Sequence, residues 1–270
     1  MSNINMSFQD NNKVMIVYTT AGYPIADPEF FVDFVLALED AGVNIVEVGV
    51  PFSDPVADGG VIQRAMQGAL QKGVKLQEVF YYIEALRRHS KIPVVIFGYF
   101  NPFFRMGLES LKMKLKSLSI DAILIVDLPI EEGKDWFIGF RQSGIDPILI
   151  VSNNISPERL QKVSCLAGGF IYVTSMYSTT GNSFSIQQKL IETVNAARSI
   201  LKMHVCVGFG IKNVSDVLAL KPYVDGVIVG SAIIESLEAG FSLGGCKKAI
   251  ELAASKAREL ANALREDEKL

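Results

Sequence analysis

The chain has 270 residues, of which 49% are hydrophobic and 20% charged, and its formal net charge is −3 at pH 7. This composition supplies a large buried core, and the negative balance disfavours nucleic acid or an anionic membrane as the main partner. Cys165, Cys206 and Cys246 are scattered without CxxC spacing, which favours free thiols in a reducing compartment. The N-terminus does not resemble a signal peptide, and no uninterrupted apolar run of about 18 residues is present. We therefore expect a soluble, cytoplasmic protein without a disulfide framework.

Short β-branched runs alternate with longer amphipathic segments along the chain. Strands are predicted at Val14–Thr19, Asn44–Val48, Val94–Phe97, Ala122–Val126, Pro147–Val151, Phe170–Val173, His204–Val207 and Gly226–Val229. Helices are predicted at Pro28–Ala41, Gly60–Gln71, Leu76–His89, Glu109–Ser117, Glu131–Ser143, Ser156–Leu166, Ile186–Ser199, Val214–Leu220 and Gly245–Leu264. About eight such strand–helix units indicate an α/β protein with a (β/α)8 (TIM) barrel, because parallel strands need helical crossovers. An open doubly wound sheet remains the rival fold.

The barrel prediction includes an extra N-terminal helix and long active-site loops. The one long connection runs from the second strand to the third and contains Asp58 and the extra helical pattern Gly60–Gln71. Loops that follow the C-terminal ends of barrel strands build the active site. No linker or low-complexity tract suggests a boundary, so we expect residues 1–270 to form one domain.

Two carboxylates stand out around the second strand. Glu47 lies inside the apolar run IVEVG, and burial of a carboxyl raises its pKa, so that it can hold and donate a proton near neutral pH. Asp58 follows in the loop beside Gly59 and Gly60 and would stay ionised if it were more solvated. The alternatives are a structural glutamate paired with a lysine or arginine, and an aspartate that only forms a turn. Asp54 has the same turn interpretation, with a contact to a partner protein as its alternative.

Glycines at the ends of the last two strands predict a phosphate site. Gly208-Phe209-Gly210 follows the seventh strand, and Gly230-Ser231 follows the eighth and precedes a helical pattern. Barrels often bind phosphate with these two loops and a helix N-terminus. Glycines also end strands in ordinary turns, so either motif alone is weak evidence. Because both occur, after the seventh and the eighth strand as in phosphate-binding barrels, we predict a phosphorylated small molecule as the ligand.

Other kinds of chemistry lack their usual residues. His89 ends a basic helix and His204 begins a strand, so solvent or packing roles are expected for both. No lysine lies at the C-terminal end of a predicted strand, where a Schiff-base nucleophile would stand. The sequence shows no cluster of metal ligands, and we expect no metal.

At this point several motifs identify a family. VEVGVPFSDPVADGGVIQRA strongly resembles the signature of the tryptophan synthase α subunit. The similarity covers essentially the whole chain and continues through TTAGYP (Thr19–Pro24), YFNP (Tyr99–Pro102), VDLP (Val126–Pro129), GFGI (Gly208–Ile211) and VGSAI (Val229–Ile233).

The resemblance implies retro-aldol cleavage of indole-3-glycerol phosphate to indole and glyceraldehyde 3-phosphate, without a cofactor in this chain. It implies that Glu47 is the general acid/base and that Asp58 stabilises the indole N–H. Substrate-binding positions would be Tyr18, Ile62, Phe97, Tyr99, Leu124, Tyr172, Thr180 and Phe209, and phosphate-binding positions Gly181, Gly210, Gly230 and Ser231. The family works as an αββα complex with a pyridoxal-phosphate β subunit, which Asp54 and the Tyr99–Phe104 loop would contact.

The chain departs from the family at the mobile loop after the sixth strand. The usual pattern is close to S-R-x-G-V-T-G, whereas residues 175–181 read SMYSTTG, with Met176, Ser178 and Thr179 as substitutions. A second change replaces Gly-Pro after the aspartate with Gly59-Gly60. Because loop closure completes such sites, two functions remain open: a working lyase, or an impaired α subunit kept as an allosteric activator of the β subunit. A phosphate-binding isomerase of the same pathway is a more distant alternative.

Overall fold

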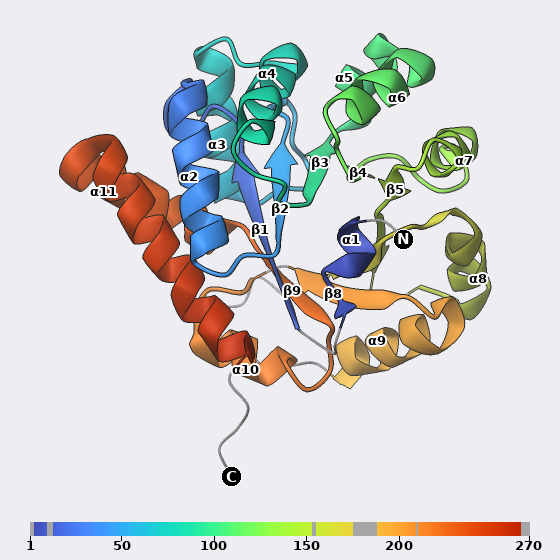
Figure 1. Cartoon of the computed structure of the whole chain (residues 1–270). Helices are drawn as coiled ribbons and strands as arrows, with labels where there is room; N and C mark the ends of the chain where they lie inside the picture. The colour runs from blue at the N-terminus through green and yellow to red at the C-terminus, as the bar shows by residue number, and fades with distance from the viewer. Residues whose placement is uncertain (1–2, 10–12, 153–154, 175–187, 209, 266–270) are drawn as a thin grey trace.

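A ring of parallel strands forms the centre of the molecule (Figure 1). The computed structural model describes residues 3–9, 13–152, 155–174, 188–208 and 210–265. Within them the strand order is β5-β4-β3-β2-β1-β9-β8-β7-β6, and every pairing is parallel. The strands are β1 (Val14–Thr20), β2 (Ile45–Gly49), β3 (Val94–Gly98), β4 (Ala122–Ile125), β5 (Asp146–Pro147), β6 (Leu149–Ser152), β7 (Phe170–Thr174), β8 (His204–Gly208) and β9 (Gly226–Val229).

The two end strands of this order, β5 and β6, are consecutive pieces of the predicted fifth strand. β5 pairs with β4, and β6 pairs with β7 on the other side. Ile148 lies between the pieces, and its N–H donates to the carbonyl of Ile123 at 2.9 Å. Pro147 has no N–H for the ladder, which is consistent with a break here. The ring therefore has eight strand positions, as predicted, and the sheet has no reversal of strand order that a doubly wound fold requires.

Helices surround the ring of strands (Figure 1). They are α1 (Asn3–Met6), α2 (Pro28–Asp40), α3 (Gly60–Gln71), α4 (Leu76–Arg87), α5 (Phe100–Met106), α6 (Leu108–Ser117), α7 (Lys134–Gln142), α8 (Pro157–Leu166), α9 (Gln188–Leu201), α10 (Val214–Leu220) and α11 (Ser231–Arg265). Helix α5 occupies a segment that we expected to be a loop. Helix α11 breaks at Gly244 and Gly245, where Gly245 has a φ of 66°, so the predicted Gly245–Leu264 helix is its second half.

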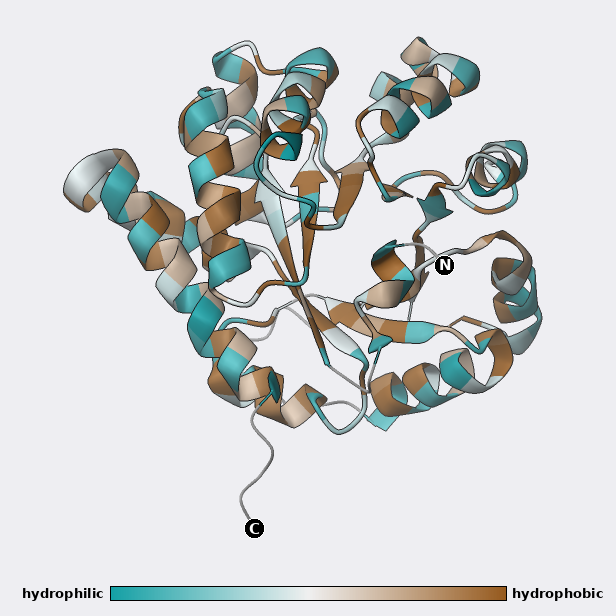
Figure 2. Cartoon of the chain, in the orientation of Figure 1, coloured by the Kyte–Doolittle hydropathy of each residue, from teal (hydrophilic) through white to brown (hydrophobic). Residues whose placement is uncertain are grey.

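Alternation along each strand builds two separate hydrophobic regions. On β1, Met15 and Val17 point outward and pack under the helices, whereas Ile16 and Tyr18 belong to the cluster inside the barrel. Both sides of a parallel strand are thus buried, which explains the near-continuous apolar runs in the sequence. Figure 2 shows the consequence: the strands are largely hydrophobic, whereas the helices carry both hydrophobic and hydrophilic residues.

Helix α1 lies over the N-terminal end of the barrel, as the expected extra helix (Figure 1). Ile4 is fully buried, and the Phe8 ring stacks on His204 at 4.3 Å between ring centroids. The Asn3 amide donates to the Asp121 carboxylate at 2.7 Å. This end of the barrel is therefore packed by side chains, and His204 has a packing role, one of the two roles expected for it.

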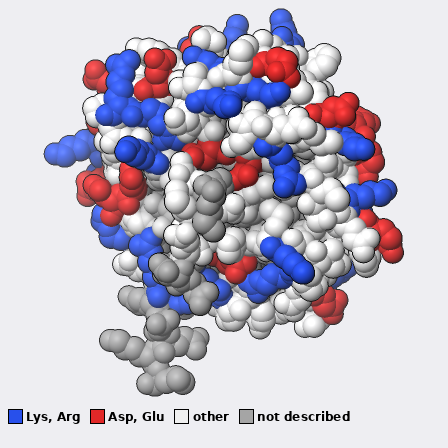
Figure 3. All heavy atoms as spheres, turned by 45° about the vertical axis from the view of Figure 1, so that its right-hand side comes forward, with Lys and Arg blue, Asp and Glu red and all other residues white. Residues whose placement is uncertain are grey.

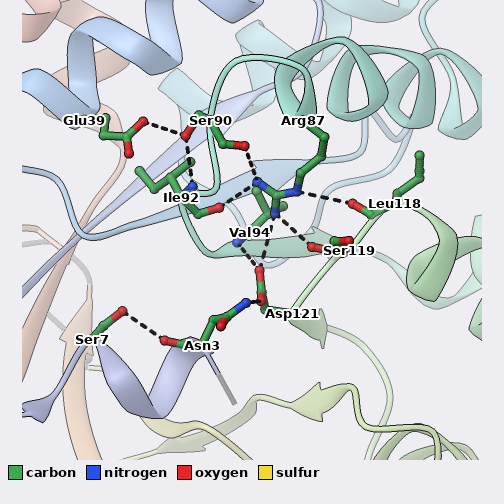
Figure 4. Close-up of polar contacts among 10 residues, drawn as sticks. All are labelled: Asn3, Ser7, Glu39, Arg87, Ser90, Ile92, Val94, Leu118, Ser119 and Asp121. Atoms are coloured by element: carbon green, nitrogen blue, oxygen red, sulfur yellow. Dashed lines mark hydrogen bonds and ion pairs between the residues drawn. The ribbon is translucent and has the colours of Figure 1, made fainter. Parts of the chain in front are cut away.

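A polar network centred on Arg87 ties together the α4–β3 and α6–β4 connections near α1 (Figure 4). The guanidinium donates to the carbonyls of Leu118, Ser119 and Ile92 at 3.2, 2.9 and 2.8 Å, and it lies 3.4 Å from the Asp121 carboxylate. Only 15% of the Arg87 side chain is exposed. Removing this side chain would leave several acceptors without their donor.

The outer surface carries both signs of charge. Acidic and basic side chains are interspersed over the face in Figure 3, in line with the small net charge. None of the helices in the described part of the chain has the length and apolar character that crossing a membrane requires. Cys165, Cys206 and Cys246 are all free thiols.

Candidate active site

Glu47 projects into the C-terminal half of the barrel from β2. It lies in register with Tyr18 on β1 and with Val95 on β3. Only 1% of its surface is exposed, and no described residue forms a hydrogen bond with its buried Oε1 atom. The structural alternative, a glutamate paired with a lysine or arginine, therefore finds no support among the described residues. An unpaired buried acid costs stability, and such costs concentrate at functional sites.

The surroundings of Glu47 favour its protonated form. Burial, with a smaller contribution from the negative charge of Asp58, raises the pKa of Glu47 to about 8. At pH 7 most Glu47 side chains therefore hold a proton that they can donate.

Asp58 is held beside Glu47 by a tyrosine. The Tyr99 hydroxyl donates to Asp58 Oδ2 at 2.7 Å and accepts from the Ala57 N–H at 3.1 Å. The Tyr99 ring stacks on Phe52 with centroids 4.8 Å apart. Burial raises the pKa of Asp58 to about 6, and the Tyr99 hydrogen bond opposes that rise. At pH 7 Asp58 is thus mainly ionised while Glu47 is mainly protonated, a division of roles typical of acid/base sites.

Aromatic side chains line the barrel around these two acids. Tyr18 meets Phe97 edge to face at 5.0 Å, and Leu124 and Tyr172 belong to the same interior cluster. All of these predicted substrate-binding residues are thus brought together with Glu47. Tyr99 belongs to this cluster as well, and Ile62 packs against it from α3.

Gly49 and Gly208 make room for the tyrosines, a role that was predicted for neither of them. A Cβ atom on Gly49 would lie 2.2 Å from the Tyr18 hydroxyl, and one on Gly208 would lie 2.2 Å from the Tyr172 hydroxyl. Any side chain at either glycine would displace its tyrosine. The signal was a glycine at the end of an otherwise β-branched strand, which often marks a close approach.

The predicted phosphate site lies at the turn between β9 and α11. Ser231 is the first residue of α11, and the N–H groups of Ile233 and Ile234 already donate to the Gly230 carbonyl. A Cβ atom on Gly230 would lie 3.4 Å from Tyr18 and 3.5 Å from Ile62, so this turn adjoins the aromatic cluster. A helix N-terminus there favours an anion.

Of the remaining predicted residues, Gly210 follows β8 and the others lie outside the described residues. Gly210 has a φ of 75°, which suits glycine. Phe209, Thr180 and Gly181, with the rest of the substituted segment 175–181, lie outside the described residues. Within the described ranges, no group of three or more His, Cys, Asp or Glu side chains could hold a metal ion.

A (β/α)8 barrel with a buried acid and a neighbouring aspartate at the C-terminal end of its strands has the arrangement of an enzyme of the barrel class. The model of the family described as "Tryptophan synthase alpha chain" matches residues 4–265. The chain belongs to this family, and it is accordingly a carbon–carbon lyase of tryptophan biosynthesis.

Individual relatives agree with the family model. The tryptophan synthase alpha chain of Petrotoga mobilis is 37% identical over 88% of this chain and 91% of its own length. Among solved structures, the α subunit of Legionella pneumophila covers 98% of both chains with a TM-score of 0.87 and 27% identity. A chain of the tryptophan synthase complex of Pyrococcus furiosus covers 92% of this chain and 98% of its own length, with a TM-score of 0.81 and 33% identity.

Proposed function

We propose that Glu47 and Asp58 carry out the family's reaction, the cleavage of indole-3-glycerol phosphate to indole and glyceraldehyde 3-phosphate. The observation that carries these assignments is the buried carboxyl of Glu47, whose Oε1 atom has no hydrogen-bond partner among the described residues and which is mainly protonated at neutral pH beside an ionised Asp58. The two groups supply an acid and an anion in one apolar chamber.

In the proposed mechanism, Glu47 gives its proton to indole C3, and Asp58 accepts a hydrogen bond from the indole N–H as positive charge develops on the ring. The Glu47 carboxylate then takes the proton of the glycerol hydroxyl next to the scissile bond. The C–C bond breaks, its electron pair returns to the indole ring, and that hydroxyl carbon becomes the aldehyde. Glu47 ends the cycle protonated, so it acts as acid and base in turn.

The same geometry supports the proposed roles of the aromatic side chains inside the barrel and of the phosphate turn, by which we mean Gly230 and Ser231 between β9 and α11. Tyr18, Phe97 and Tyr172 surround the space in which the flat indole ring would lie. Gly230 and Ser231, together with Gly210, would bind the phosphate at the start of α11. Thr180, Gly181 and Phe209 stay predictions. One domain over residues 1–270 is supported by the packing of α1 on the barrel and of α11 on α2.

The partner of this chain is the tryptophan synthase β subunit. A similar Pyrococcus furiosus structure is described as showing mutual activation of the tryptophan synthase a2b2 complex. Here Val56, two residues after Asp54, is 84% exposed, and Phe104 on α5 is 60% exposed, so both expected contact segments offer an apolar side chain for such a contact. Pyridoxal phosphate would belong to the β subunit, and the free thiols support a cytoplasmic complex.

Indole release from indole-3-glycerol phosphate, measured with and without the β subunit, tests the activity. We expect turnover that rises when the β subunit is present. The alternative is an α subunit that activates the β subunit without catalysing cleavage, and it is based on the substitutions in residues 175–181. It would be favoured only if this chain stimulated the β reaction while releasing no indole.

A further inference from the structure

A carboxylate on α11 joins two segments that are distant in sequence. The Tyr23 hydroxyl, from the loop between β1 and α2, donates to Glu238 Oε1 at 2.7 Å. The Arg64 guanidinium, from α3, donates to Glu238 Oε2 at 3.3 Å. One carboxylate therefore holds the loop after β1, the helix after β2 and the helix after β9.

On the α3 side, these contacts lead to Asp58. Arg64 also donates to the carbonyl of Gly60, the first residue of α3, at 3.3 Å. Next to it, the Gln63 amide donates to the Asp58 carbonyl at 2.8 Å and to the Pro55 carbonyl at 3.3 Å. The first turn of α3 thus fixes the backbone of the loop that carries Asp58.

Packing reinforces the same junction. A Cβ atom on Gly68 of α3 would lie 2.8 Å from the Tyr23 ring, so only glycine lets this ring lie directly on the helix. The Lys72 ammonium covers the ring at 5.8 Å from its centroid. Glu238 lies two helical turns after Ser231, in the half of α11 that starts at the proposed phosphate turn.

We propose that Glu238, with Tyr23 and Arg64, is a brace that sets the distance between Asp58 at the indole end of the site and Ser231 at the phosphate end. This positioning role rests on the proposed function. The exposed Arg64–Glu238 pair alone would add little stability, since 59% of the Arg64 side chain is exposed. The Tyr23 bond makes the carboxylate a three-way junction, and a fixed span favours a ligand that touches both ends at once.

The brace is tested with an unreactive ligand, 3-(indol-3-yl)propyl phosphate, which carries an indole and a phosphate but no hydroxyl beside the scissile bond. For Glu238→Ala we expect Kd for this ligand to rise about tenfold, whereas binding of indole alone or inorganic phosphate alone changes less than about twofold. Glu238→Gln keeps an acceptor for Tyr23 and should recover part of the affinity. As a control, Arg198→Met breaks the 2.8 Å ion pair with Asp225 at the N-terminal end of the barrel and should leave all three affinities unchanged.

The outcomes separate the two proposals. If the wild-type chain fails to bind the spanning ligand, the proposed function is wrong and the brace falls with it. If the wild type binds and Glu238→Ala binds equally well, the brace alone is wrong. Equal weakening for indole, phosphate and the spanning ligand, or the same loss in Arg198→Met, would also contradict it, because a general loss of stability would then explain the effect.

Discussion

Glu47 and Asp58 carry the same functional group but ionise in different pH ranges because of their surroundings. Glu47 lies inside the barrel, where no described residue donates a hydrogen bond to its Oε1 atom, whereas Asp58 accepts a hydrogen bond from Tyr99. The sequence alone predicted Glu47 as a candidate acid, because a carboxylate inside a parallel strand is unusual, whereas the role of Asp58 was implied by the family resemblance. It did not predict the Tyr99 bond, because the two residues lie on different loops and only the fold brings them within 2.7 Å.

The raised pKa of Glu47 predicts how stability varies with pH. Between its usual value of 4.5 and about 8, the folded state binds a proton that the unfolded state has lost, so stability falls as pH rises through this window. The loss approaches an upper bound of about 5 kcal/mol. We expect Glu47→Gln to unfold at higher urea than the wild type at pH 8.5 and to show a flatter dependence between pH 5 and 8.5. Parallel curves for the two proteins would contradict the buried, proton-holding Glu47.

Tyr99→Phe tests whether the Tyr99 hydroxyl controls the pKa of Asp58. The Tyr99 hydrogen bond lowers the pKa of Asp58, which burial raises to about 6, so its loss should raise that pKa further. The acid limb of the kcat/KM profile should then move to higher pH, with activity at pH 7 falling about tenfold. An unchanged profile would show that Asp58 does not need to be ionised.

At the scale of elements, the two ends of the barrel have different tasks. The N-terminal end is packed by α1 and the Arg87 network (Figures 1 and 4). The C-terminal end holds Glu47, Asp58 and the turn between β9 and α11 that we propose to bind phosphate. Helix α5 was not predicted because its segment, YFNPFFRM (Tyr99–Met106), lacks the alternation of apolar and polar residues that marks an amphipathic helix. The break between β5 and β6 at Ile148 was not predicted, because an apolar run does not reveal with which neighbouring strand each residue pairs. Glu238 pairs with Arg64 and Tyr23, which lie 174 and 215 positions away from it in the sequence, and no local sequence pattern reveals such contacts.

Arg87→Met measures how much the Arg87 network at the N-terminal end of the barrel contributes to the free energy of unfolding. Because the guanidinium donates to four backbone carbonyls and pairs with Asp121 while only 15% of the side chain is exposed, its loss should lower the free energy of unfolding by about 2–4 kcal/mol. Urea denaturation checks this value, and kcat/KM should stay within about twofold at a temperature where the variant is folded. Arg159→Met is the matched control, since its ion pair with Glu131 is half exposed on both sides and should be worth less than about 1 kcal/mol. Equal losses in both variants would contradict the account.

At the scale of the whole molecule, the barrel was predictable because its eight strand positions repeat one pattern, and each repeat needs a helical crossover. The family followed from motifs spread over the chain, and the match over residues 4–265 agrees with them. The effect of the substituted 175–181 segment on the rate could not be predicted in the same way. A loop that closes over a substrate acts through the difference between two states, and a difference of about 3 kcal/mol changes the rate by about a hundredfold.

The central claim is that Glu47 is the proton donor and acceptor for carbon–carbon cleavage. Indole release from indole-3-glycerol phosphate by the wild type and by Glu47→Gln, each in complex with the β subunit at pH 7, tests it most directly. The account predicts turnover by the wild type and at least about a thousandfold less by Glu47→Gln, with the fold intact by circular dichroism. Glu47→Gln turnover within about tenfold of the wild type would contradict it.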